Sequence, residues 1–92
     1  MRTIFSSVFE SDFAEIIAYY ASDVTPELSV RFEKCVVETF EQIAAHPEIG
    51  HRRKDLAHPE IRSHIVAGFE NYIIFYQLRK EEIFFVRLLH GA

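Results

Sequence analysis

Two apolar runs near the C-terminus constrain the fold more than any other feature of the sequence. They are YIIFYQL at residues 72–78 and IFFVRLL at residues 83–89, and the charged tetrapeptide RKEE separates them. Each run has the length of a β-strand, and a short polar connection between two such runs predicts an antiparallel hairpin. A strand with one face in water should alternate apolar and polar residues. Both faces of these strands are largely apolar, so both need a cover.

The second run shows what has to be covered. Strict alternation divides its side chains into two sets, with Ile83, Phe85, Arg87 and Leu89 on one face and Phe84, Val86 and Leu88 on the other. One face of the hairpin can pack against the rest of the chain. The other face is covered either by the chain's own loop at residues 51–60 or by a partner protein, because large exposed apolar patches mark interaction sites.

The rest of the sheet is predicted from shorter patterns. Residues 61–67, IRSHIVA, alternate and extend the hairpin to a three-stranded antiparallel meander. The preceding segment at 51–60, HRRKDLAHPE, is polar and contains Pro59, which predicts a loop. Residues 2–9 alternate loosely and suit a short first strand.

A first helix is predicted in the segment SDFAEIIAYYASD. Phe13, Ile16, Ile17 and Tyr20 recur at positions i, i+3, i+4 and i+7, which lie on one face of a helix. Ser11 is the predicted N-cap of this helix.

A second helix has the clearest start signal in the chain. Thr25 is a capping residue, and Pro26 follows it at the first helical position. The helix should end at His46, because the residue before a proline is disfavoured in helical conformation, and Pro47 comes next. Only a few residues around Asp23 connect the two helices, which predicts an antiparallel helical hairpin.

Together these elements predict one α+β domain over residues 1–92, in the order β-α-α-β-β-β. The N-terminal strand and the helical hairpin would accompany a three- to four-stranded antiparallel sheet, with the hairpin packed on one face of that sheet. No apolar stretch reaches the roughly 18–20 residues that cross a bilayer, and the first ten residues lack the apolar core of a signal peptide. The single cysteine, Cys35, excludes an internal disulfide and fits a reducing compartment. We therefore expect a cytoplasmic protein with no membrane partner.

The charge is divided unevenly between the two halves of the chain. Residues 1–50 carry nine acidic and three basic residues, a net of −6, and residues 51–92 carry five acidic and seven basic residues, a net of +2. The bland interpretation is two solvated faces, and the sharper one is a basic functional surface in the C-terminal half. The net charge of −4 argues against broad nucleic-acid binding, so we expect no direct DNA binding by this chain alone.

Motifs for cofactors and metals do not occur in the sequence. There is no phosphate-binding loop and no dinucleotide fingerprint. The five histidines lack a compact metal-ligand spacing. We therefore expect neither a cofactor nor a metal site.

Four segments occur in an order that resembles the RelE/ParE superfamily of bacterial toxins from type II toxin–antitoxin modules. They are DFAEIIAYYA at 12–21, RFEKCVVETFEQIAAHPEIGHRRKDL at 31–56, IRSHIVAGFENYIIFYQL at 61–78 and IFFVRLLHGA at 83–92. The resemblance covers nearly the whole chain, and it rests on the joint occurrence of these segments.

The resemblance implies a toxin that inhibits bacterial growth and that a cognate antitoxin neutralises by wrapping around it. Such an antitoxin lays a helix or a strand on the toxin's sheet and helices. The second face of the sheet would then await the antitoxin, and the residues that strict alternation and the resemblance assign to that contact are Phe75, Phe84, Val86 and Leu88.

The superfamily has two functional branches, and the sequence is more similar to the ParE branch, whose members poison DNA gyrase. RelE-like members cut messenger RNA in the ribosomal A site and carry the pattern Tyr-Arg-apolar-apolar-Tyr in the third strand. Here the segment reads Tyr72-Ile73-Ile74-Phe75-Tyr76, so Ile73 replaces the arginine. RelE-like toxins are also typically basic, with a basic aromatic tail, whereas this chain is acidic and its sequence ends at Ala92. DNA gyrase is therefore the expected target, and a non-enzymatic role is favoured.

The candidate functional residues are basic. Arg52, Arg53 and Lys54 form the densest cluster, and with Arg62 and Arg87 they are the predicted target-binding residues. Under the alternative of an mRNA endoribonuclease, Arg52, Lys54, Arg62 and Arg87 would stabilise charge on the scissile phosphate, and His90 or His64 would move a proton. Under the bland alternative, the cluster is a solvated loop with an arginine paired to a carboxylate. A third possibility is an inactive family member that only binds its antitoxin.

Overall fold

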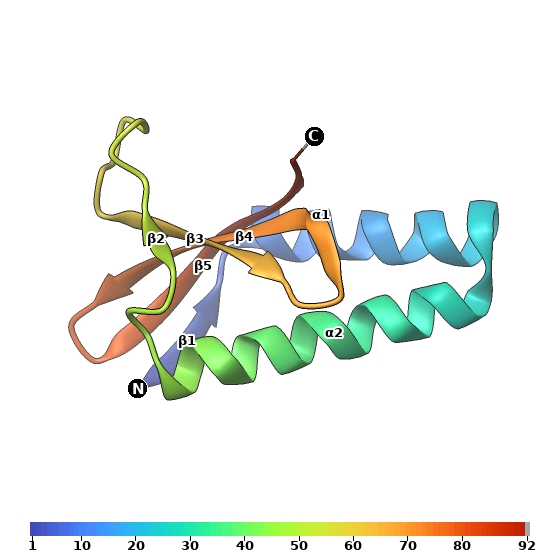
Figure 1. Ribbon diagram of the computed structural model, residues 1–92, viewed down its shortest axis with the longest axis horizontal. Coiled ribbons are helices and arrows are strands. Elements are labelled where there is room, and N and C mark those ends of the chain that lie inside the picture. The colour runs from blue at the N-terminus through green and yellow to red at the C-terminus, as the bar shows by residue number, and fades with distance from the viewer. Residues whose placement is uncertain (92) are drawn as a thin grey trace.

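The structure is a computed structural model that describes residues 1–91, and Ala92 lies outside the described residues. Helices and strands follow one another in the predicted order, with one added short strand (Figure 1). The elements are β1 Arg2–Phe5, α1 Ser7–Tyr19, the π-helical turn η1 Tyr20–Val24, α2 Pro26–Ala45, β2 His51–Arg52, β3 Ile61–Val66, β4 Phe69–Arg79 and β5 Glu82–His90. The predicted α+β class and the element order are confirmed.

The sheet has five strands in the order β1-β5-β4-β3-β2. Strands β3, β4 and β5 form the predicted antiparallel meander. β1 pairs with β5 in parallel, from Arg2 opposite Glu82 to Phe5 opposite Phe85. The sheet is therefore mixed and larger than the expected three- to four-stranded antiparallel sheet. Part of the difference is β2, which pairs with β3 inside a segment that was expected to be a loop throughout.

The N-cap of the first helix lies five residues earlier than predicted. Ser6, rather than Ser11, is the N-cap, and its hydroxyl accepts a hydrogen bond from the Phe9 backbone N–H at 2.9 Å. The same hydroxyl donates to the Val86 carbonyl at 2.8 Å. Residues 7–9, expected in the first strand, are therefore the first turn of α1, and Phe9 lies in the core. Ser6 is held in place by its contact with Val86 in β5, and a local sequence pattern carries no information about so distant a contact.

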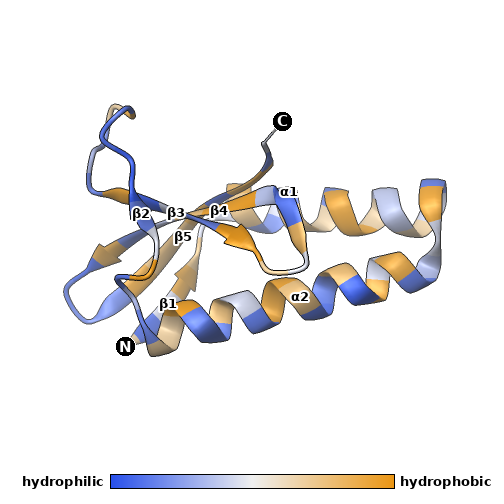
Figure 2. Cartoon of the chain, viewed as in Figure 1, coloured by the Kyte–Doolittle hydropathy of each residue, from blue (hydrophilic) through white to orange (hydrophobic). Residues whose placement is uncertain are grey.

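The second helix begins and ends as predicted. The Thr25 side chain accepts a hydrogen bond from the Leu28 backbone N–H at 3.1 Å, and Pro26 occupies the first turn. The helix ends at Ala45, directly before His46 and Pro47. The two helices run side by side and are joined at their far end by η1 (Figure 1). Both apolar and polar residues occur along α2 (Figure 2), and its buried residues recur every three or four positions, as in an amphipathic helix.

The core lies between the helical hairpin and one face of the sheet. Its largest fully buried side chains come from both layers and include Phe9, Phe32, Ile43, Ile74, Tyr76, Ile83 and Phe85. Within residues 1–91, both helices lie on the same side of the sheet (Figure 1), and the opposite face is called the outer face below. Within the described part of the chain, no helix has the length and apolar character that crossing a membrane requires.

A β-bulge changes the alternation along β5. Tyr76 pairs with Phe85, but the preceding Phe75 pairs with Arg87, so Val86 is an extra residue between the two pairs. The bulge turns Leu88 toward the helices, where it is 1% exposed. The placement of Leu88 with Phe84 and Val86 on the open face was therefore wrong. Leu89, expected on the same face as Ile83 and Phe85, is exposed instead.

Candidate functional site

Three of the predicted basic residues gather around one hollow of about 570 Å³ beside β2. Arg52 comes from β2, Lys54 from the loop that follows it, and Arg62 from β3. The hollow is also lined by His51, Asp55 and Ile49. We call His51, Arg52, Lys54 and Arg62 the basic surface. Arg52 and Lys54 are exposed and make no ion pair with any residue from 1 to 91.

A buried tyrosine holds the segment that leads into the basic surface. The Tyr76 hydroxyl donates to the Pro47 carbonyl at 2.7 Å and accepts from the Gly50 backbone N–H at 2.8 Å. Burial raises the pKa of the Tyr76 phenol, so the hydroxyl stays protonated and remains a donor. Gly50 packs so closely that an added Cβ would lie 2.5 Å from the Tyr76 oxygen. Only glycine fits at this approach.

Arg62 completes the anchoring of this segment. One of its terminal nitrogens donates to the Gly50 carbonyl at 2.9 Å and to the Glu48 carbonyl at 3.2 Å. An arginine within an apolar strand needs a polar partner, and backbone carbonyl oxygens supply it for Arg62. Arg62 is both a lining residue of the basic surface and a support for it.

Arg53 is separated from its two neighbours. Its guanidinium makes two hydrogen bonds to the Asp55 carboxylate, at 2.7 and 2.8 Å, and lies over the Phe75 ring with 5.4 Å between the guanidinium carbon and the ring centroid. The hydrogen bonds from Arg53 lower the pKa of Asp55 to about 2. Arg53 is thus the arginine paired with a carboxylate that the bland alternative anticipated, and it covers part of the outer face instead of joining the basic surface.

The outer face keeps an apolar hollow of about 210 Å³. Its lining residues are Leu56, Ile61, Phe75, Val86, Arg87 and Leu89. Arg79 lies over the ring of Phe84, with 4.0 Å between the guanidinium carbon and the ring centroid. Arg53 and Leu56 belong to the loop at 51–60, so the chain's own loop covers part of this face. The rest of the apolar surface around Val86 and Leu89 is left open.

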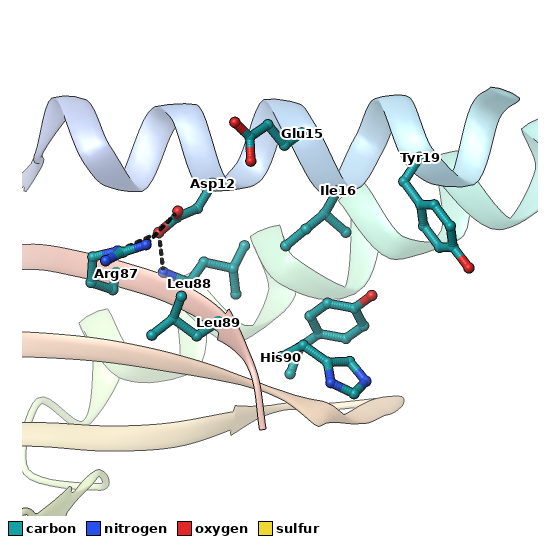
Figure 3. Close-up of a pocket in the computed structure, with 9 residues that line it drawn as sticks. Asp12, Glu15, Ile16, Tyr19, Arg87, Leu88, Leu89 and His90 are labelled. Atoms are coloured by element: carbon teal, nitrogen blue, oxygen red, sulfur yellow. Dashed lines mark hydrogen bonds and ion pairs between the residues drawn. The ribbon is translucent and has the colours of Figure 1, made fainter. Parts of the chain in front are cut away.

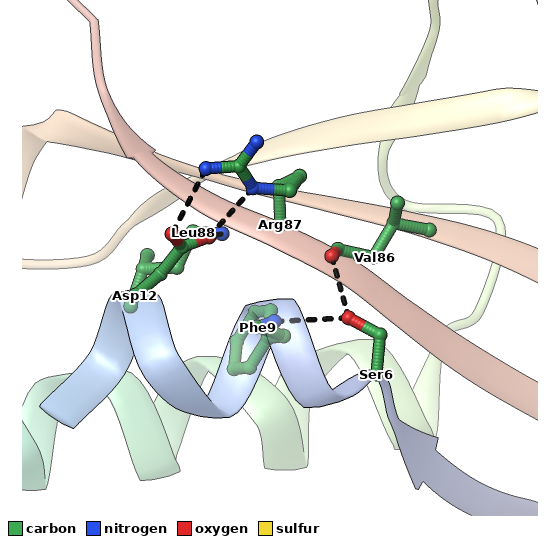
Figure 4. Close-up of polar contacts among 6 residues, drawn as sticks. All are labelled: Ser6, Phe9, Asp12, Val86, Arg87 and Leu88. Atoms are coloured by element: carbon green, nitrogen blue, oxygen red, sulfur yellow. Dashed lines mark hydrogen bonds and ion pairs between the residues drawn. The ribbon is translucent and has the colours of Figure 1, made fainter.

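Arg87 and His90 lie near the end of β5, beside α1, and neither lines the hollow of the basic surface. Arg87 makes two hydrogen bonds to the Asp12 carboxylate, at 2.8 and 2.9 Å, and the hydrogen bonding from Arg87 holds the pKa of Asp12 below its usual value (Figure 4). His90 packs edge-on against Tyr72, with 5.0 Å between ring centroids. Both line a cleft of about 350 Å³ between α1 and the end of β5, with Glu15 and Tyr19 on the helical side (Figure 3). The structure therefore does not bring Arg87 and His90 together with Arg52, Lys54 and Arg62.

Several residues that shape these sites were not identified from the sequence. Gly50 and Tyr76 support the basic surface, Ile49 lines it, and Asp12 binds Arg87. Pro47 and Gly50 closely precede the basic run at residues 52–54. This proximity is a sequence signal that the segment turns here and is held by contacts from elsewhere in the chain. Among residues 1–91, no group of three or more histidine, cysteine or acidic residues is arranged to hold a metal ion.

Comparison with known proteins gives a family and a fold. Residues 3–92 match the family model described as ParE toxin of type II toxin-antitoxin system, parDE. Among solved structures, the chain is similar to one titled "Chromosomal ParDE TA system from P. aeruginosa", with a TM-score of 0.82 and 16% sequence identity. That likeness covers 100% of this chain and 97% of the other, and it confirms the fold. No curated protein matches the chain. Since the family model spans nearly the whole sequence, the chain belongs to the ParE toxin family of type II toxin–antitoxin systems.

Proposed function

We propose that this chain is a ParE-like toxin that arrests bacterial growth by inhibiting DNA gyrase and that a cognate antitoxin neutralises it. Family membership over residues 3–92 is the observation that carries the proposal. The proposal places the chain in the cytoplasm, where gyrase acts. It treats the chain as a protein-binding inhibitor, not as an enzyme.

The arrangement of the basic residues supports the gyrase branch over the nuclease branch. Arg62 is engaged with backbone carbonyls, Arg53 with Asp55 and Arg87 with Asp12. His90, one of the two proton carriers considered for the nuclease alternative, lines a cleft that does not include Arg52 or Lys54. His64, the other, does not line the hollow that holds Arg52, Lys54 and Arg62. A phosphoryl-transfer site needs its cations and its proton carrier converging on one reacting atom. The predicted set does not converge in this way.

The target contact is assigned to the basic surface. Arg52 and Lys54 are exposed, and Arg62 lies beside them in the same hollow. Arg53 and Arg87, also predicted to bind the target, are engaged in intramolecular ion pairs. We therefore do not assign Arg53 and Arg87 to the target contact, and we give them structural roles instead.

The antitoxin contact is assigned to the outer face. Phe75, Phe84 and Val86 lie on that face, and Leu89 extends the apolar surface beside Val86. Leu88 is excluded from this contact because it is buried against the helices. Covering apolar surface contributes roughly 25 cal/mol per Å² before association costs, so a few hundred Å² of this face can supply substantial binding free energy.

The order in which DNA and protein synthesis stop tests this proposal. The chain alone would be induced in bacteria, and incorporation of labelled thymidine and labelled methionine would be followed over the first minutes. Gyrase inhibition predicts that DNA synthesis falls first. Earlier loss of protein synthesis would favour the RelE-like endoribonuclease, and unchanged growth would identify an inactive member that only binds its antitoxin.

A further inference from the structure

Ile49 is an exposed apolar residue at the centre of a charged region. It is 45% exposed and lies between two hollows. On one side is the hollow of about 570 Å³ that the basic surface lines, and on the other is a hollow of about 400 Å³ beside His46, Pro47 and Glu48. Among residues 1–91, no other Leu, Ile, Val or Phe lines either hollow.

The exposure of Ile49 is fixed by its neighbours in the chain. Its own N–H donates to the His46 carbonyl at 2.9 Å. The Arg62 guanidinium binds the carbonyls of Glu48 and Gly50, on either side, and Tyr76 binds the Gly50 N–H. The side chain is therefore presented on a backbone that is already ordered. A preorganised surface pays less conformational entropy when a partner binds.

The larger hollow beside Ile49 is positively charged although the chain is acidic, and the hollow on the other side is lined by Glu48. Arg52, Lys54 and Arg62 line the hollow against the single carboxylate of Asp55, which gives three positive charges and one negative charge, a net of +2. The Asp55 carboxylate is already engaged by two hydrogen bonds from Arg53. A partner that enters the larger hollow therefore meets cations beside an apolar side chain.

We propose that Ile49 and the basic surface form one docking surface for an acidic protein segment that carries an apolar side chain at its centre. The partner's apolar side chain packs on Ile49, and its carboxylates pair with Arg52, Lys54 and Arg62. An apolar centre with a polar rim is the arrangement of protein–protein interfaces. The phosphates of a nucleic acid would pair with the cations, but they would not account for the exposed apolar side chain of Ile49. The proposal rests on the proposed toxin function, and it names the chemistry of the target segment.

Peptide binding tests this surface without any assumption about gyrase. Two peptides would be titrated into the wild-type chain, and binding would be followed by NMR. In the first peptide one leucine is flanked by glutamates, and in the second a serine replaces that leucine. The expected result is a set of shifts at Ile49, Arg52 and Lys54 and an affinity about threefold or more higher for the leucine peptide. Equal affinities, or no shifts at these residues, would overturn the proposal. Stronger shifts with a single-stranded RNA of equal charge would also overturn it.

A matched pair of variants separates the docking surface from the proposed target. Ile49→Thr removes the apolar centre, and Val37→Thr, on α2, changes a residue that is also 45% exposed. Ile49→Thr is expected to weaken binding of the leucine peptide about threefold or more, while Val37→Thr leaves it unchanged. The same two variants would be compared for inhibition of purified gyrase. If only the gyrase readout fails for the wild-type chain, the proposed target is wrong and the docking surface stands.

Discussion

Arg87 and Asp12, 75 residues apart in the sequence, form a bidentate ion pair that joins β5 to α1. Asp12 also accepts the Leu88 backbone N–H at 3.0 Å. Strand β1 ends at Phe5, so β5 loses its parallel neighbour beyond Phe85. The first helix and its N-cap take over this edge: Ser6 donates to the Val86 carbonyl and Asp12 binds Arg87 (Figure 4), and Asp12 also accepts from Leu88 (Figure 3). Side chains of one helix thus satisfy the free edge of a strand.

Removal of the Asp12 carboxylate should destabilise the fold. Asp12→Ala loses three hydrogen bonds and leaves the Leu88 N–H without its acceptor, which should cost about 1–3 kcal/mol in the free energy of unfolding. Chemical denaturation would measure the loss. Asp23→Ala, at an exposed aspartate in η1, is the control. Equal losses in the two variants would contradict the role assigned to Asp12.

The same carboxylate predicts how stability depends on pH. Hydrogen bonding from Arg87 lowers the pKa of Asp12 in the folded chain, so the folded state binds its proton less readily than the unfolded state. The stabilisation is complete above the unfolded pKa of about 4 and is lost as the pH falls through the folded pKa. The difference in unfolding free energy between wild type and Asp12→Asn should therefore be larger at pH 7 than at pH 3. A constant difference across this range would rule out the linkage.

Tyr76 is predicted to hold the basic surface in place. Tyr76→Phe removes the hydroxyl that binds Pro47 and Gly50, which should cost about 1–3 kcal/mol and raise amide hydrogen exchange at residues 50–54. Tyr72→Phe, on the same strand, removes a hydroxyl that does not touch this segment and should leave that exchange unchanged. The prediction fails if both variants show the same exchange at residues 50–54.

The outer face is predicted to separate antitoxin binding from toxicity. Val86→Lys places a charge in the apolar hollow and should weaken binding of the cognate antitoxin about tenfold or more. Toxicity of the chain expressed alone should persist, because Arg52 and Lys54 are unchanged. Val30→Lys, at a residue of α2 that is 70% exposed, is the control for an added charge. Calorimetry with the antitoxin and growth after co-expression would measure the two effects.

Local patterns in the sequence predicted the parts of the fold that depend on neighbouring residues. Thr25, Pro26 and Pro47 act within one helical turn, so the bounds of α2 were recoverable. The meander of β3, β4 and β5 follows from short connections. The parallel pairing of β1 with β5 joins segments about 80 residues apart, and no local pattern marks it.

The errors at the candidate sites have the same cause. The bulge at Val86 moves Leu88 into the core, and a period of two along the strand cannot register an extra residue. Basic residues were identified by type, but their partners were not. Asp12 removes Arg87 from the basic group through a contact between residues 75 positions apart, which forms only when the chain folds. Asp55 removes Arg53 through a contact between residues two positions apart, which depends on the conformation of the loop.

Inhibition of supercoiling by purified DNA gyrase tests the central claim most directly. The wild-type chain and the double variant Arg52→Ala/Lys54→Ala would be added at micromolar concentration to gyrase, relaxed plasmid and ATP. The expected result is inhibition by the wild type that falls about tenfold or more in the double variant, because the two exposed cations of the basic surface are removed. Unchanged supercoiling in the presence of folded wild-type chain would contradict the assignment of gyrase as the target.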